Sequence, residues 1–311
     1  MPPETVYDAV ILGGGPAGLS AAVYAARKMM KAVLVSGNVG GQVASYYDIE
    51  NYLGFSMVGA ADLVSRFERH VDKFGLEKAI GRRIVGAELD GPVKRLVNDD
   101  GRAFLTKTLI IATGKRPRPL GVPGEQEFMG RGVAVCSTCD APLFAGADVA
   151  VVGGGNSALE AVVDLAKVAR SVTLVARTSL SADPILIEKI KEYKNLTILP
   201  EHETLAVMGG KNGVTGLRVR QKGSDKAREL AVEGVFVEIG LLPNSELFRG
   251  KIELNTAGEI VIDARCRTSV QGVFACGDVT DVPYKQVVIA VGEGAKAALA
   301  ANEYLLMKQT H

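Results

Sequence analysis

Two glycine-rich turns, 140 residues apart, constrain the fold of this chain more than any other feature. The first follows a strand-sized apolar run (7–12) and places Gly13, Gly15 and Gly18 in the spacing G-x-G-x-x-G. The first glycine of this fingerprint allows a sharp turn, the second lets a pyrophosphate approach the backbone, and the third lets a helix pack on the strand. Apolar residues then recur at helical spacing, so segment 7–37 is predicted to be strand, turn, helix and strand.

The second turn repeats this pattern in segment 147–177, where Gly153, Gly155 and Ala158 give G-x-G-x-x-A after another apolar strand. One such fingerprint is weak evidence, but two complete copies predict an α/β protein with two dinucleotide-binding folds. A single working site beside a purely structural copy is the alternative. Neither copy ends its second strand with the acidic residue that usually holds an adenosine ribose, since Ser36 and Ala176 stand there.

Composition narrows the class of protein. The 311 residues are 47% hydrophobic, which suits one large or two ordinary domains, and the net charge of +1 gives no argument for nucleic acid or an anionic membrane. The N-terminus lacks the basic and apolar regions of a signal peptide, and no apolar stretch approaches the ~18 residues of a membrane span. We therefore expect a cytoplasmic protein.

Four cysteines occur, and two of them, Cys136 and Cys139, form a C-x-x-C pair. One such pair, with the three histidines distant in sequence, does not make a zinc ligand set, so no metal is expected. A redox-active pair is favoured, and a static disulfide or two core thiols is the alternative. Helix-terminal N–H groups would stabilise a thiolate there. Cys266 and Cys276 lie in apolar stretches and are expected in the core.

The order of the motifs resembles the low-molecular-weight thioredoxin reductases and, equally, the reductase portion of the flavoprotein that serves bacterial alkyl hydroperoxide reductase. The resemblance covers nearly the whole chain. It rests on GGGPAG (13–18), GGQV (40–43), DIENYLG (48–54), ATG (112–114), CSTCD (136–140), GGGNSALEA (153–161) and ACGDVTDVPYKQVVIAVGEGAKAA (275–298).

This resemblance implies two Rossmann-like three-layer nucleotide-binding domains, the second inserted into the first. The FAD domain is expected at 1–116 plus 246–311, and the NAD(P)-type domain, which carries the cysteine pair, at 117–245. The family is usually homodimeric. Its smaller domain rotates, which lets the dithiol reach a protein substrate.

Residues in the matching motifs are predicted to bind FAD. Asp278 corresponds to the aspartate that bonds the ribityl chain, and the segment at Lys285 approaches the flavin ring. The full predicted set is Gly13, Gly15, Pro16, Ala17, Gly18, Gly41, Gln42, Asn51, Thr113, Gly114, Gly277, Asp278, Lys285, Gln286 and Val287.

The resemblance also assigns catalytic roles. Cys139 would face the flavin and receive electrons, Cys136 would attack the disulfide of thioredoxin or a thioredoxin- or glutaredoxin-like protein, and Asp140 would manage protons. The implied function is that of an FAD-dependent thioredoxin-disulfide reductase. Two alternatives are the electron-feeding flavoprotein of a peroxidase system, which would need a separate dithiol carrier, and a flavin-binding regulatory or ferredoxin-reductase-like module without disulfide chemistry.

The electron donor is left open. The residues predicted for NADPH or NADH are Gly153, Gly155, Asn156, Ser157, Ala158 and Arg177. NADPH-dependent relatives hold the 2′-phosphate with a His-Arg-Arg cluster, of which only Arg177 survives, between Ala176 and Thr178. The glutamate of NADH-dependent relatives is absent as well. Poor discrimination between NADPH and NADH, a donor such as ferredoxin or a deazaflavin, and a merely structural second fold are the three hypotheses.

Basic residues near position 116, where the chain is expected to pass from the first domain to the second, have two interpretations. Lys115, Arg116 and Arg118 could dock an acidic partner or could simply form a solvated loop.

Overall fold

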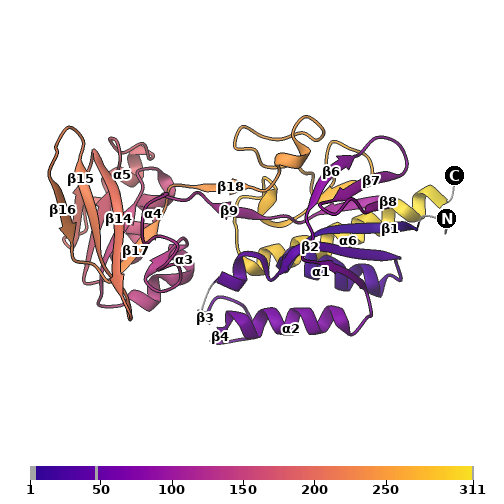
Figure 1. Cartoon of the computed structure of the whole chain (residues 1–311), viewed down its shortest axis with the longest axis horizontal. Coiled ribbons are helices and arrows are strands. Elements are labelled where there is room, and N and C mark those ends of the chain that lie inside the picture. Colours follow the sequence, from indigo (N-terminus) through magenta and orange to yellow (C-terminus); the bar gives the residue numbers. More distant parts are fainter. Residues whose placement is uncertain (1–4, 46–47, 310–311) are drawn as a thin grey trace. The chain divides into compact units, whose positions relative to one another are not determined.

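The chain divides into two compact units in the computed structural model, which describes residues 5–45 and 48–309 (Figure 1). One unit combines Met1–Arg116 with Leu242–His311, and the other is the continuous segment Pro117–Leu241. In Figure 1 the first unit therefore carries the two ends of the colour scale, and the second carries the middle.

The boundary at the return crossing differs from the sequence expectation, which placed residues 242–245 in the inserted unit. They belong instead with the first unit. The physical reason is Asn244, whose backbone N–H donates to the Gly114 carbonyl (3.0 Å) and whose side-chain amide donates to the Thr113 carbonyl (2.8 Å). The connecting strands β9 (Lys115–Pro117) and β18 (Leu241–Pro243) pair with each other.

The first unit is built on a seven-stranded sheet with the order β5-β2-β1-β8-β7-β6, and β19 also pairs with β8. Strands β5, β2, β1, β8 and β19 are parallel, whereas β7 and β6 extend the sheet in antiparallel fashion. The strands are β1 (Val6–Gly14), β2 (Ala32–Val39), β5 (Glu77–Ile80), β6 (Ile84–Glu88), β7 (Lys94–Asn98), β8 (Ala103–Ile111) and β19 (Val273–Ala275); a short hairpin adds β3 (Asp48–Ile49) and β4 (Val58–Gly59).

Alternate residues of the central strand face two separate cores. Ile11 packs in a cluster with the helices α1 (Pro16–Arg27) and α6 (Val287–Gln309), while Val10 packs with Phe248 and Ile260 on the opposite face. Burial on both faces explains why the strand reads as a continuous apolar run. The remaining elements are α2 (Ala60–Asp72) and the short helices η1 (Gly41–Ser45), η3 (Glu246–Phe248) and η4 (Gly277–Val279).

The second unit has three layers. Its central parallel sheet has the order β10-β17-β11-β12-β13, and an antiparallel sheet β14-β15-β16 forms a further layer. One face of the parallel sheet packs on helical residues such as Leu159, and the other packs on Leu217 and Val219 of the antiparallel sheet. The strands are β10 (Val133–Ala134), β11 (Asp148–Val152), β12 (Ser171–Val175), β13 (Leu196–Leu199), β14 (His202–Gly210), β15 (Gly213–Gln221), β16 (Ala227–Leu230) and β17 (Gly234–Val237); the helices are α3 (Ser137–Asp140), η2 (Ala141–Phe144), α4 (Asn156–Leu165) and α5 (Pro184–Ile190).

These two sheets confirm the predicted α/β class with Rossmann-like nucleotide-binding folds. Each glycine fingerprint lies where a parallel strand passes into a helix, β1 into α1 and β11 into α4. Across residues 5–45 and 48–309, none of the helices combines the length and the apolar character that a membrane crossing requires.

Candidate active site and nucleotide sites

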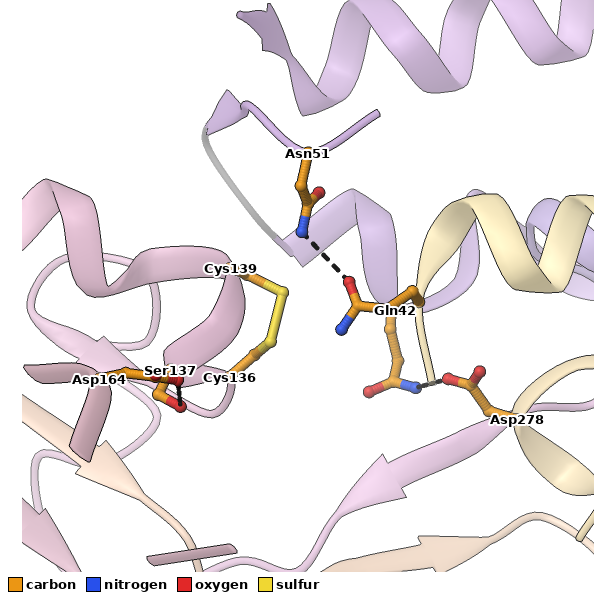
Figure 2. Close-up of a disulfide and its surroundings, with 8 residues drawn as sticks. Gln42, Asn51, Cys136, Ser137, Cys139, Asp164 and Asp278 are labelled. Carbon is orange, nitrogen blue, oxygen red and sulfur yellow. Dashed lines mark hydrogen bonds between the residues drawn. A yellow bond between two sulfur atoms is a disulfide. The ribbon is translucent and has the colours of Figure 1, made fainter. Parts of the chain in front are cut away.

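The C-x-x-C pair forms a disulfide at the start of α3. Cys136 and Cys139 have Cα atoms 5.4 Å apart and are bonded through their sulfur atoms. Cys136 is the N-cap of the helix, and the Asp140 N–H donates to its carbonyl (3.1 Å). Figure 2 shows the disulfide beside Ser137, whose hydroxyl donates to Asp164 of α4 (3.4 Å). The N-cap position gives a Cys136 thiolate access to the free N–H groups of the first turn.

Asp140 follows the second cysteine directly and is buried, with 8% of its surface exposed. Burial raises the pKa of this carboxyl to about 6. A carboxyl that titrates close to neutrality can both donate and accept a proton there. The geometry is therefore compatible with the proton-handling role predicted for Asp140.

Glu238 is a second carboxyl beside this helix, and sequence reasoning missed it. It directly follows β17, and the backbone N–H of Ser137 acts on its carboxyl by lowering the pKa. Burial raises its pKa to about 7, and the nearby carboxylates of Glu160 and Asp164 add to this effect. Its position after an apolar strand gave no sequence signal, because the contact with α3 depends on the strand order of the sheet.

The second glycine fingerprint has the geometry of a phosphate-binding turn. A Cβ on Gly153, whose φ is +153°, would lie 2.2 Å from the Glu238 carbonyl oxygen, whereas a Cβ on Gly155 would meet nothing within 4 Å. The turn is thus closed on the sheet side and open at the N-terminus of α4, where Asn156 and Ser157 are exposed and Ala158 is buried. An open helix N-terminus of this kind suits an anion.

The end of β12 carries little charge. Ala176 is buried, with 1% of its surface exposed, and Arg177 is exposed. The following loop folds back on the fingerprint, because the Ser181 N–H donates to the Gly154 carbonyl (2.8 Å) and Asp183 exchanges two hydrogen bonds with Asn156 (2.8 and 2.9 Å). Arg177 remains the cation of this loop that could meet a 2′-phosphate.

The first fingerprint is closed by the same steric logic. Gly13 has a φ of +120°, and a Cβ there would lie 2.2 Å from the Ala112 carbonyl oxygen; a Cβ on Gly18 would lie 1.8 Å from the Gly13 carbonyl oxygen. At Gly15 the nearest neighbour would be the Cα of Gly41, 4.0 Å away. Pro16 opens α1, and Ala17 is buried against α6. The open N-terminus of α1, at Gly15, therefore fits the pyrophosphate of a dinucleotide.

Ser36 occupies the position where an acidic residue was missing from the sequence pattern. Its hydroxyl accepts a hydrogen bond from the Gly14 N–H (2.8 Å) and donates one to the Asn38 carbonyl (2.7 Å). The side chain is buried and so fixes the turn to the end of β2. The absence of an acid here has a structural reason, because a hydroxyl can satisfy both groups.

Residues from the two ends of the chain meet around this turn. Figure 2 shows the Gln42 amide donating to the Asp278 carboxyl (3.4 Å). The Asn51 amide donates to the Gln286 side chain (3.1 Å). Each pair joins residues more than 230 positions apart. The remaining predicted FAD residues also belong to this first unit: Gly41, Thr113, Gly114, Gly277, Lys285 and Val287.

A buried ion cluster adjoins these residues. Glu259, 14% exposed, pairs with Lys115 and lies 3.4 Å from the Lys285 amine. Burial lowers the pKa of Lys285, and burial raises the pKa of Asp278. The cluster gives the predicted flavin site polar groups of both signs, which fits a ring with carbonyl oxygens and N–H groups.

The two cysteines outside the C-x-x-C pair have structural roles. The Cys266 thiol donates to Glu293 (3.3 Å); burial and this carboxylate raise its pKa to about 12, and burial raises the pKa of Cys276 well above its usual value. Both thiols are fully buried, in line with the core assignment. Two of the basic residues at the boundary between the units also have partners: Lys115 pairs with Glu259 and Arg116 with Glu246 (2.7 Å), so these two are held within the first unit.

Comparison with known proteins identifies the family. The model of the pyridine nucleotide-disulphide oxidoreductases matches residues 7–294, which is most of the chain. This protein belongs to that family. Members of this family are flavoprotein oxidoreductases, and membership implies FAD and NAD(P)H as cofactors.

Individual relatives match along nearly the whole chain. The structure is similar to thioredoxin reductase from Streptococcus pyogenes MGAS5005 (33% identity, 97% of this chain and 99% of that chain, TM-score 0.91) and to thioredoxin reductase from Giardia duodenalis (31% identity, 98% and 100%, TM-score 0.91). In sequence it is 45% identical to an alkyl hydroperoxide reductase protein of Pseudomonas putida over 97% of this chain. The chain spans 59% of that relative's length. Both resemblances predicted from the motifs are confirmed.

Proposed function

We propose that this chain is a thioredoxin-disulfide reductase that reduces thioredoxin or a similar small dithiol protein. The observation that carries the proposal is the Cys136–Cys139 disulfide at the N-terminus of α3, in a chain similar over 97% of its length to a thioredoxin reductase. Bound FAD would accept a hydride from the nicotinamide and supply two electrons to the disulfide.

The residues of the chain then have distinct roles. The residues predicted above for FAD, from the turn at Gly13 to the start of α6, would hold the cofactor. Reduction breaks the disulfide, and the Cys136 thiolate, next to the free N–H groups of α3, attacks the disulfide of the partner protein. The new mixed disulfide is resolved by Cys139, which releases the partner as a dithiol. Asp140 would take and return protons during these exchanges.

The proposed electron donor follows from the residues at the end of β12, where Arg177 stands in place of a cluster of basic side chains. One exposed arginine in place of a cluster supports use of NADPH or NADH with poor discrimination, because each lost charge-assisted hydrogen bond removes about 1.5–3 kcal/mol of binding preference. Anaerobic mixing with NADPH or NADH should bleach the flavin absorption. Failure of both at millimolar concentration would favour ferredoxin or a deazaflavin as the donor, or a structural role for the second fold.

A second candidate function has its own support. The 45% identity to the alkyl hydroperoxide reductase protein of Pseudomonas putida favours an electron-feeding role in a peroxidase system through a separate glutaredoxin- or thioredoxin-like carrier. Disulfide-reduction assays with purified thioredoxin and with a glutaredoxin-like carrier separate the two candidates. In either case Cys136→Ser and Cys139→Ser should abolish turnover, and activity equal to that of the parent in both variants would refute the mechanism.

A further inference from the structure

The carboxyl ends of β12 and β13 lie level with each other and are tied to the start of β14. Val175 is opposite Leu199 in this parallel pair, and the Ala176 N–H continues the ladder by donating to the Leu199 carbonyl (3.0 Å). The Ala176 carbonyl in turn accepts the N–H of His202 (2.9 Å), the first residue of β14. His202 is therefore hydrogen-bonded to the residue that directly precedes Arg177.

Strand alternation places Arg177 on the side of the antiparallel sheet. Leu174 packs in the cluster that includes the helices, whereas Val175 packs in the cluster shared with β14 and β15. A Cβ on Gly154 would lie 3.3 Å from the Ala176 Cβ, so Ala176 keeps to the helix side, beside the glycine turn. Because successive side chains of a strand point to opposite faces, Arg177 is expected on the side of Val175.

The same rule places His202 on the face of β14 that is turned to the parallel sheet. Val219 of β15 is buried against that sheet, and Thr204 lies directly opposite it in the β14–β15 pair. Opposite residues of an antiparallel pair share a face, as do residues two apart along one strand. His202, two residues before Thr204, therefore shares the face of Val219. Arg177 and His202 thus approach the end of β12 from two chain segments.

The ring of His202 is held so that one nitrogen is available. Its Nδ1 lies 2.7 Å from the Pro200 carbonyl oxygen, and a carbonyl can only accept, so Nδ1 carries a proton. The next side chain, that of Glu203, bonds Arg220 on the neighbouring strand (2.7 Å). The Nε2 atom of His202 has no hydrogen-bond partner among residues 5–45 and 48–309, and the side chain is partly exposed. Nε2 can therefore bond a ligand.

The charge around this strand end is positive. Arg177 and Lys222 are exposed, and neither has an ion pair in the part of the chain that the structure describes. The Lys222 N–H donates to the carbonyl of Glu201 (2.7 Å), whose own N–H donates to the Thr178 carbonyl (3.5 Å). Two cations thus stand against the exposed Glu201 carboxylate, and a protonated His202 would add a third. This balance suits an additional phosphate group.

We propose that His202 is a specificity-determining residue that contacts the 2′-phosphate of NADPH together with Arg177, in place of the histidine that is missing at Ala176. This inference rests on the proposed use of a nicotinamide nucleotide and names the source of a preference for NADPH. The adenosine ribose of a dinucleotide lies at the end of the second strand of such a fold, here β12. A protonated imidazole donates from both nitrogens, so Nε2–H can bond a phosphate oxygen while Nδ1–H stays on Pro200.

Binding of nucleotide fragments to the oxidised full-length protein tests this role without electron transfer. Isothermal titration compares adenosine 2′,5′-bisphosphate, which carries the 2′-phosphate, with AMP, which lacks it. In His202→Asn the side-chain amide can still donate to the Pro200 carbonyl, but no positive charge can form. The matched control is Lys211→Ala, which removes an exposed cation just beyond the opposite end of β14.

The parent protein should bind the bisphosphate about tenfold more tightly than AMP. His202→Asn should weaken binding of the bisphosphate about fivefold and of AMP less than about twofold. Arg177→Ala should act in the same direction, the double variant should not distinguish the two fragments, and Lys211→Ala should match the parent. Equal affinity of the parent for both fragments, no binding of either, or equal weakening of both by His202→Asn would overturn the proposal.

The unmodified protein provides an independent check should His202→Asn fail to fold. Diethyl pyrocarbonate modifies accessible imidazole nitrogens, and peptide mass spectrometry can follow His202 with His70 of the first unit as the internal control. At saturating concentrations, the bisphosphate should slow modification of His202 more than AMP does and leave His70 unchanged. Equal protection of His202 by both fragments would refute the contact.

These measurements are independent of the dithiol. Fragment selectivity that depends on His202, in a protein that fails to reduce thioredoxin, would refute only the proposed function. Reduction of thioredoxin by a protein whose fragment binding is unchanged in His202→Asn would refute only the role of His202.

Discussion

Asp140 is predicted to reduce the stability of the folded protein at neutral pH, because its carboxylate is buried beside Cys139. The pKa of this buried carboxyl is about 6 in the folded chain, against an ordinary value of 3.8. The folded state therefore binds its proton more tightly than the unfolded state does. Stability is unaffected below about pH 4, falls as the pH rises towards 6, and stays at the lower level above it.

The magnitude follows from the size of the shift. Two pKa units, each worth about 1.4 kcal/mol, give an upper bound of about 3 kcal/mol at pH 8. Asp140→Asn removes the charge and should stabilise the oxidised protein by about 1–3 kcal/mol at pH 8 and by close to nothing at pH 4. The same change should slow reduction of a protein disulfide by about 100-fold or more, because a positioned acid–base group is lost.

Urea unfolding of the oxidised protein at a series of pH values measures the first effect, and steady-state turnover measures the second. Asp164→Asn on the neighbouring helix is the control; its side chain is 39% exposed, so its replacement should change stability by less than about 0.5 kcal/mol. A stability difference between Asp140→Asn and the parent that is the same at pH 4 and pH 8 would refute the reasoning, because burial of an ionised carboxylate could not then be its cause.

Three further predictions test the nucleotide sites. Gly13→Ala should destabilise the protein by at least ~3 kcal/mol and lower its FAD content, measured by flavin absorption, while Gly15→Ala, with an open neighbourhood, should leave stability within ~1 kcal/mol. Arg177→Ala should raise KM for NADPH about tenfold or more and leave KM for NADH unchanged in steady-state assays; equal effects on both would contradict a 2′-phosphate contact. Glu259→Gln leaves two buried lysines without their carboxylate and should cost about 2–4 kcal/mol in urea unfolding; a neutral result would show that the lysines are solvated.

Sequence patterns predicted the parts of this protein whose cause is local. The spacing of Gly13, Gly15 and Gly18 could be recognised directly, because it is a short local motif: the Gly13 carbonyl oxygen leaves no room for a Cβ on Gly18, whereas Gly15 has an open neighbourhood. The demand on Gly13 comes instead from the carbonyl oxygen of the distant Ala112. The second fingerprint and the C-x-x-C pair could be recognised because they too are short patterns of neighbouring residues. Resemblance to a family added the discontinuous arrangement, which no local pattern contains.

Tertiary structure alone decided the contacts that join distant segments. The Ser137 N–H influences the pKa of Glu238 because β17 lies between β10 and β11 in the sheet, although it is the last of these strands along the chain. Gln42 meets Asp278 across 236 residues for a similar reason. The pKa values of Asp140 and Glu238 likewise depend on how much water the surrounding elements exclude. A sequence specifies short-range sterics and periodicity, whereas burial and the charge around a group are properties of the packed chain.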